Sequence, residues 1–262
     1  MKPMINANRR KSRYILSGNS DYKGVRIDVS LGENDEKTKK PKMQSVYAYE
    51  ADDGTIKCAK NDVDEVRQDV IRRIRLINYY DNGFQIGCFM MIVVMLFGSL
   101  ICFILKEFNL ARALLGTSYL STGAFLTAPL WSQTFLRILG NEKTIRFCRF
   151  HAAEHSVINA YSDLGRVPTL DEIRGYSMFD YNCGATEVAK KGWYWFGAFI
   201  FMSLPGIAAL VFGAIFILIS ILAHFFEKFV FLQAIAIKKP TDKEYEVAIK
   251  ALEEVLILVE HA

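Results

Sequence analysis

The feature that most constrains the fold of this 262-residue chain is an uncharged apolar run, IGCFMMIVVMLFGSLICFIL, which extends from Ile86 to Leu105. A helix that crosses the hydrocarbon core of a membrane needs about 20 apolar residues, and this run has that length. Residues 1–85 are instead rich in charged and turn-forming residues. The sequence therefore predicts an integral membrane protein with a sizeable water-exposed N-terminal region.

Two further segments are predicted to lie in the membrane. Residues 110–131 form a weaker second span, because Arg112 lies near its start and small or hydroxyl residues interrupt it; an amphipathic helix at the membrane surface is the alternative. Residues 192–226 carry no Asp, Glu, Lys or Arg, and at about 1.5 Å per residue they exceed one crossing of about 30 Å. The string Leu204-Pro205-Gly206 predicts a break and hence a helical hairpin, with one long kinked span as the alternative.

The distribution of charge predicts orientation and partners. Basic side chains precede the first span and recur in the loop between the second and third segments: Arg67, Arg72, Arg73, Arg75, Arg146, Arg149, Lys190 and Lys191. The positive-inside rule then places both termini and this loop in the cytoplasm of a multi-pass protein of the plasma membrane. A net charge of +4 suits a lipid bilayer as partner and is too small to indicate nucleic acid. Other membrane proteins or a second copy of the chain are further candidate partners.

The predicted fold is mainly α, with three to four transmembrane or re-entrant helices, a cytoplasmic helix that contains histidines, and a small β-rich N-terminal element. Apolar and polar residues alternate on both sides of Asp53-Gly54, which is typical of a hairpin, and residues 25–30 favour another strand. An amphipathic helix is predicted from Asp62 to Ile77. The predicted division is a cytoplasmic N-terminal region (1–85), the first two membrane helices (86–131), a cytoplasmic helix and loop (132–191), an apolar hairpin (192–226) and a cytoplasmic C-terminal helix (227–262).

Two of the four histidines of the chain lie one helical turn apart in the string RFHAAEHSVINAYSD. Because positions i and i+4 share one face of an α-helix, His151 and His155 can hold one metal ion. A helix over residues 144–163 places them on a polar stripe with Asn159, and turns Glu154 by about 60° from His151. The string H-x-x-E-H resembles the inverted zinc-peptidase signature, in which the glutamate is a base. The alternative is a pair of histidines that form hydrogen bonds to neighbouring segments.

The segment after this helix offers further ligands. Thr169 and Glu172 match a capping box, which predicts a short helix that ends near Tyr176. The chain then reaches Asp180 and Cys183, and either a carboxylate or a thiolate could complete a set of ligands. A polar loop without a ligand is the alternative.

The C-terminal segment is predicted to be a helix, since Thr241 and Glu244 match a second capping box. Asp242 and Glu246 lie one turn apart near its start, where they could accept hydrogen bonds from the imidazoles. Asn159 and Tyr176 are the other supporting residues of the predicted site. The alternative for Asp242 and Glu246 is a helix cap and a solvated face.

The strings FHAAEH, PTLDEIRGYS, NCG and KKPTDKEYEVAIKALEEVL occur in this order, with an apolar segment before the last. In this order and spacing they resemble the YqhQ-like family of bacterial membrane proteins over roughly residues 140–258. The resemblance implies a metal-dependent membrane enzyme. The family usually has His-Pro-Arg before its Cys-Gly, whereas this chain has Asp180, Tyr181 and Asn182, so Asp180 would stand where a family histidine stands. The sequence thus indicates a divergent member.

These patterns favour a membrane-embedded metal-dependent enzyme, a hydrolase, with a divalent cation, zinc, as cofactor. His151 and His155 would be ligands together with Asp180 or Cys183, and Glu154 would be the catalytic general base. The alternative is a non-catalytic membrane scaffold, or an accessory protein for assembly or insertion, in which the histidines form a structural polar core. A transporter is disfavoured by the lack of charged residues inside the predicted spans.

Overall fold

The structure is a computed structural model, and it describes residues 13–34, 41–60, 63–72, 75–126, 135–180, 183, 199, 210–215, 218–219, 221 and 237–261. The chain divides into two compact units. The first contains Met1–Ile74, Leu139–Asp180 and Ala236–Ala262, and the second contains Arg75–Ile138 and Tyr181–Ile235. The first unit therefore joins three segments that are far apart in the sequence.

An antiparallel sheet of four strands, in the order β1-β2-β3-β4, forms one layer of the first unit. The strands are β1 (Ile15–Ser20), β2 (Gly24–Asn34), β3 (Pro41–Glu50) and β4 (Ile56–Ala59). Glu50 pairs with Ile56 across the turn between β3 and β4. In this turn Gly54 has a φ of 81°, a left-handed conformation that glycine adopts without a steric penalty. The hairpin predicted around Asp53-Gly54 is confirmed.

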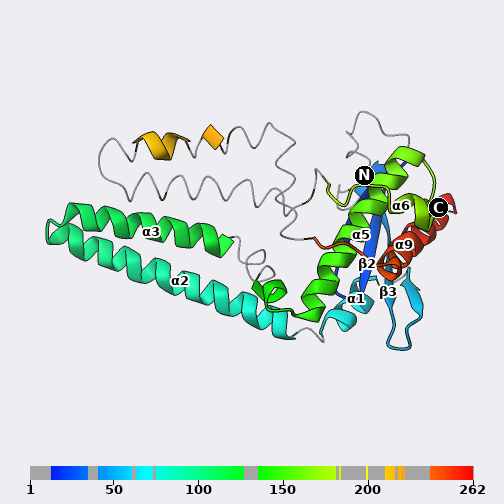
Figure 1. Ribbon diagram of the computed structural model, residues 1–262, viewed down its shortest axis with the longest axis horizontal. Coiled ribbons are helices and arrows are strands. Elements are labelled where there is room, and N and C mark those ends of the chain that lie inside the picture. Colours follow the sequence, from blue (N-terminus) through cyan, green and yellow to red (C-terminus); the bar gives the residue numbers. More distant parts are fainter. Residues whose placement is uncertain are drawn as a thin grey trace. The chain divides into compact units, whose positions relative to one another are not determined.

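Helices cover both faces of this sheet (Figure 1). On one face, α5 (Glu142–Leu164) lies along β1, and α9 (Asp242–Glu260) lies along β2 and β3. The short helix α6 (Leu170–Ile173) packs against α5 and α9. Alternate residues of a strand point to opposite faces, so Tyr47 and Tyr49 of β3 point to the other face of the sheet. The valines of α1 (Val63–Arg72) pack against these two tyrosines.

The core of the first unit lies between the sheet and the two long helices. On the strands every second residue points into the core, as Val25, Ile27 and Val29 do. On the helices every third or fourth residue does so, and Val247 and Leu252 belong to the same buried cluster. The helix α5 contributes Phe150, Ala153, Val157 and Tyr161 to the same cluster. Burial of α5 between β1, α9 and the chain that follows it gives its side chains fixed positions.

The two ends of α5 carry standard caps. At the N-terminus, the side-chain oxygen of Asn141 accepts a hydrogen bond from the Thr144 backbone N–H at 3.0 Å. At the C-terminus, Gly165 has a φ of 72° and its N–H donates to the Tyr161 carbonyl. The predicted histidine helix is therefore confirmed. It begins two residues before and ends one residue after the predicted range of residues 144–163.

The second unit contains two antiparallel helices, α2 (Arg75–Ile104) and α3 (Phe108–Leu126), which lie side by side (Figure 1). The turn between them holds Lys106 at a φ of 64°. The Ser99 hydroxyl of α2 donates a hydrogen bond to the Ala111 carbonyl of α3 at 2.8 Å. Close contact between the helices is possible because small residues such as Gly98 lie at the interface.

The prediction of a mainly α, integral membrane protein with three to four transmembrane or re-entrant helices is wrong. Among the described residues, one helical segment, Gln85–Ile104, is long and apolar enough to cross a membrane. The other predicted span, residues 110–131, does not meet that criterion in its described part, because Arg112 and several polar residues dilute the apolar run in α3. The β-rich N-terminal element was expected, but as a sheet of four strands it is a major layer of the first unit.

The predicted apolar hairpin of residues 192–226, with its break at Leu204-Pro205-Gly206, lies outside the described residues except for Phe199 and a few positions between 210 and 221. The five-part division of the chain stays a prediction.

Candidate metal centre

The two histidines of α5 lie on one side of the helix, as their spacing predicts. Their ring centroids are 4.3 Å apart and the ring planes are tilted by 56°. His155 is 2% exposed, whereas His151 is half-buried. The helix therefore places two imidazoles side by side. The ring of His155 lies deep in the protein, and the ring of His151 lies closer to the surface.

His155 has a defined tautomer. Its Nδ1 lies 2.8 Å from the backbone carbonyl oxygen of Met178. A carbonyl oxygen only accepts, so Nδ1 carries the hydrogen and donates it. The lone pair of the neutral ring is then on Nε2, which is the arrangement that metal-binding histidines adopt when a backbone carbonyl orients them.

The segment that supplies this carbonyl is held against α5 by further hydrogen bonds. The Asn159 side chain donates from Nδ2 to the carbonyls of Ser177 and Phe179, at 3.1 and 2.9 Å. The Tyr176 hydroxyl donates to the Asp163 carboxylate at 2.7 Å. Two of the predicted supporting residues, Asn159 and Tyr176, therefore position the chain that orients His155.

The short helix α6 begins with the predicted capping box. The Thr169 backbone N–H donates to Glu172 Oε2 at 2.9 Å, and Thr169 Oγ1 accepts from the Glu172 N–H. A hydrogen bond from the Arg166 guanidinium, together with the bonds from Thr169, lowers the pKa of the exposed Glu172 to about 2. This cap directs the chain back toward α5.

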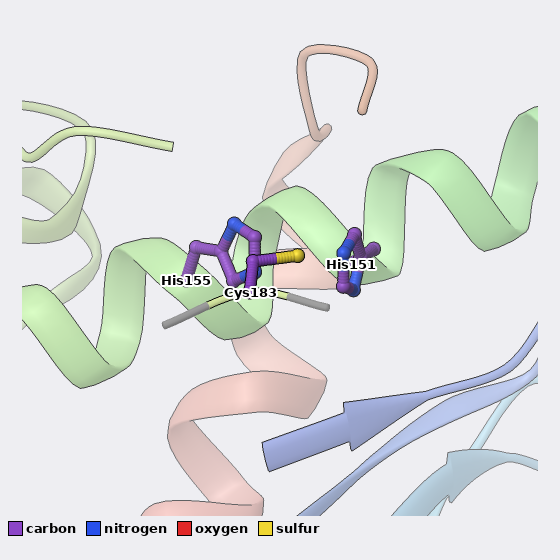
Figure 2. A group of neighbouring side chains, drawn as sticks. All are labelled: His151, His155 and Cys183. Carbon is purple, nitrogen blue, oxygen red and sulfur yellow. The ribbon is translucent and has the colours of Figure 1, made fainter. Parts of the chain in front are cut away.

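Cys183 is the third member of the group (Figure 2). One ring nitrogen of His151, one of His155 and the sulfur of Cys183 all lie within 4.8 Å of one another. Cys183 is buried and forms no disulfide. Figure 2 shows the thiol beside the two imidazoles of α5, so the described residues bring two nitrogen donors and one sulfur donor together.

Glu154 lies next to this group and is 4% exposed. Its Oε2 is 3.4 Å from Nδ1 of His151 and makes no hydrogen bond within the part of the chain that the structure describes. The hydroxyl of Ser20, in β1, is 3.1 Å from the same Nδ1. The predicted general base therefore contacts a histidine, and its catalytic role stays a prediction.

The remaining predicted residues lie elsewhere. Asp180 is half-buried and does not belong to the group that Cys183 joins. Asp242, at the start of α9, forms an ion pair with Arg174 at 2.7 Å. Glu246 is exposed on α9. The acceptors beside the imidazoles are instead the Met178 carbonyl, Ser20 and Glu154.

Two residues that sequence reasoning did not single out, Gly18 and Ser20, reach the site from β1. Ser20 and His151 are 131 positions apart in the chain. No local motif marks either residue, because their place beside α5 depends on how the strand packs on the helix. A glycine followed by a serine two residues later in a strand is too common to indicate a site.

Comparison with protein families identifies the chain. Residues 55–257 match the family described as "Protein of unknown function (DUF1385)". The chain belongs to this family. DUF1385 is the YqhQ-like family that the sequence strings resemble, so that resemblance is confirmed. No curated protein and no solved structure matched the chain.

The donor set of this DUF1385 protein fits a metal ion. Two imidazoles and a thiolate are ligands that zinc and similar transition metals accept. The orientation of His155 by a carbonyl and the buried, unbonded carboxylate oxygen of Glu154 are also features of the surroundings of a bound cation. The His151–His155–Cys183 group could therefore hold a metal ion.

Proposed function

We propose that the protein is a metal-dependent hydrolase in which His151, His155 and Cys183 bind zinc. The observation that carries the proposal is the hydrogen bond from His155 Nδ1 to the Met178 carbonyl, because it leaves Nε2 unprotonated and directed away from that carbonyl. Catalytic zinc sites keep three protein ligands and leave one position open, whereas structural sites use four. When bound, zinc supplies a Lewis acid that polarises a carbonyl or phosphoryl oxygen.

The residues of the chain provide a rigid, partly dry support for this chemistry. Hydrogen bonds from His155 and Asn159 hold the carbonyls of residues 177–179 against α5. His151 is more exposed than His155, so access for a substrate is from the side of His151. A fixed pair of imidazoles on a core helix needs little reorganisation to bind a cation.

The test is the metal content of the purified full-length protein after incubation with zinc and removal of excess metal. We expect about one zinc per chain for the wild type and almost none for the His151→Ala/His155→Ala variant, because the loss of two of three ligands leaves only a thiolate. His261→Ala is the matched control, since His261 lies at the far end of α9 and should leave the zinc content unchanged.

Hydrolysis is tested on the zinc-loaded protein with three probes: an activated carboxylic ester, an activated phosphodiester and a pool of quenched fluorescent peptides. At least one probe should be cleaved by the wild type and the His261→Ala variant and not by the double histidine variant. A wild type that retains no zinc would contradict the proposal.

One observation favours a non-catalytic scaffold as a second candidate. His155, Ser156 and Asn159 donate hydrogen bonds to backbone carbonyls of residues 177–179, so the polar stripe of α5 also joins two segments of the first unit. If the double histidine variant unfolds while the wild type binds no zinc, the stripe is a structural polar core and this candidate is supported.

We also propose that α2 anchors the protein in the plasma membrane. Support comes from the apolar segment Gln85–Ile104, none of which is buried inside the protein. Arg67 and Arg72, shortly before α2, favour the cytoplasmic side for the residues that precede this helix.

A lysine in the middle of this segment tests the anchor. Val94 is 58% exposed, and a charge at the centre of a membrane helix costs about 2.5–3.5 kcal/mol on insertion scales. We expect Val94→Lys to move a large fraction of the protein from the carbonate-resistant membrane pellet to the soluble or degraded fraction. The matched control is Ile15→Lys, at a residue of β1 that is 65% exposed. Equal membrane retention of both variants would contradict the anchor.

A further inference from the structure

The side chain of Glu154, on α5, packs closely against β1. The carboxyl group of Glu154 lies against the backbone of Gly18, such that a Cβ added to this glycine would be 2.6 Å from both Cδ and Cγ of Glu154. Such distances are not found for real Cβ atoms, so any side chain at this position would displace the carboxyl group. The absence of a side chain at Gly18 therefore makes the space in which the Glu154 carboxyl group lies.

The same carboxyl group faces His151. Two oxygens lie near Nδ1 of this ring: Oγ of Ser20 at 3.1 Å and Oε2 of Glu154 at 3.4 Å. A lone pair on Nδ1 would face the negative charge of the carboxylate, whereas an N–H would be attracted to it. The Ser20 hydroxyl can accept a hydrogen bond from Nδ1, and the nearby carboxylate attracts the same hydrogen, so the surroundings favour a hydrogen on Nδ1 and a lone pair on Nε2.

We propose that Glu154 is a positioning residue that orients His151 for the metal, and that Gly18 and Ser20 of β1 complete this support. The inference rests on the proposed zinc site. In this arrangement His151 is oriented by a carboxylate and His155 by the Met178 carbonyl, so each ring keeps its lone pair on Nε2. A strand and a loop, which are remote in sequence from α5, thus set the tautomers of its two histidines.

This role differs from that of a general base. A general base must reach the proton that it removes, through a hydrogen bond or one water molecule. Glu154 is 4% exposed, with its carboxyl group packed on the Gly18 backbone and turned to a ring nitrogen. The geometry suits a nearby negative charge that keeps the hydrogen of His151 on Nδ1, which also raises the basicity of the ligating nitrogen.

The first measurement needs no metal. The metal-free full-length protein is labelled with ¹⁵N-histidine, and long-range ¹H–¹⁵N spectra at about pH 8.5, where an ordinary imidazole is neutral, report which ring nitrogen carries hydrogen. Signals of His151 are assigned by their loss in His151→Gln. We expect Nδ1–H in the wild type and a mixture of both tautomers in Glu154→Ala. An Nε2–H tautomer of His151 in the wild type would overturn the proposal.

The second measurement is zinc affinity by competition with a coloured chelator. Loss of a residue that orients a metal ligand usually costs about 10–100-fold in affinity, and we expect this range for Gly18→Ala and for Glu154→Ala. Glu154→Gln keeps an acceptor oxygen and should lose less than Glu154→Ala. Ser17→Ala is the control, because Ser17 precedes Gly18 and is exposed on the other face of β1.

The combination Gly18→Ala/Glu154→Ala separates this mechanism from a general packing defect. If the Gly18→Ala substitution acts by displacing the carboxyl group, it should reduce zinc affinity no further once that group is absent. Losses that multiply in the double variant, or wild-type affinity in Glu154→Ala, would overturn the proposal. If Gly18→Ala does not fold, as judged by circular dichroism, the tautomer of His151 and the Glu154→Gln and Glu154→Ala affinities decide.

The two measurements also separate this inference from the zinc proposal. If His151 has the Nδ1–H tautomer in the wild type and loses it in Glu154→Ala, the positioning role of Glu154 is supported even if the protein binds no zinc. In that case only the proposed zinc site fails.

Discussion

Replacing Cys183 by alanine should lower the zinc affinity of the protein by about 100-fold or more, because a metal ligand contributes more than the residues around it, whose loss costs about 10–100-fold. Asp180→Asn should leave the affinity nearly unchanged. The reason is that Cys183, and not Asp180, shares the group of donor atoms within 4.8 Å. The same pair of variants decides between the two candidate third ligands that the sequence left open.

Cobalt as a spectroscopic substitute for zinc gives a direct readout of the thiolate. The cobalt-loaded wild type should show an intense near-ultraviolet band from charge transfer between thiolate and cobalt, and Cys183→Ala should lose it. Asp180→Asn is the matched control and should keep the band. Loss of the band in Asp180→Asn, with retention in Cys183→Ala, would reverse the assignment of the third ligand.

Replacing Phe150 by alanine should destabilise the first unit by about 3–5 kcal/mol, which is the usual cost of removing a buried phenylalanine. Phe150 is fully buried, directly precedes His151 in α5 and packs in the core between the sheet and α9. The cavity left behind would remove support from the helix that carries both histidines. We therefore expect a weaker hold on zinc together with the loss of stability.

Hydrogen exchange of the full-length protein measures this effect locally. Since about 1.4 kcal/mol corresponds to a factor of ten, amides of α5 and β2 should exchange about a hundred to several thousand times faster in Phe150→Ala. The control is Phe135→Ala, at a side chain that is 55% exposed and whose loss should cost no more than about 0.5 kcal/mol. Equal protection of α5 in both variants would show that Phe150 does not support the helix.

Several local features followed from short-range patterns in the sequence. The turn at Gly54, the two capping boxes at Thr169 and Thr241 and the helix that carries the histidines all depend on residues within one or two turns of one another. Such features are encoded by backbone conformation and local hydrogen bonds, which a pattern of neighbouring residues can reveal. The i, i+4 register of His151 and His155 belongs to this class, as does the apolar segment in α2.

The number of membrane helices was overestimated, because residues 110–131 have the length of a span but Arg112 and several polar residues dilute their apolar character. Residues 110–126 lie in α3, which is packed along α2 and carries polar residues within its apolar run. The extent of the sheet was underestimated, because β1 was not predicted as a strand. Strand β1 has a short and irregular pattern, and it is recognised as a strand only because β2 pairs with it along its length.

The sequence by itself determined the two nitrogen donors of the candidate site, since helical periodicity alone places His151 and His155 on one side of α5. Only the tertiary structure decided their surroundings. Packing of β1 on α5 brings Gly18 and Ser20 to Glu154 and His151, and the return of the chain after α6 brings the Met178 carbonyl to His155 and groups Cys183 with both rings. These contacts join residues that are far apart in the sequence, such as Ser20 and His151, which are 131 positions apart. They form because burial of apolar faces fixes how separate segments pack, which no local pattern specifies.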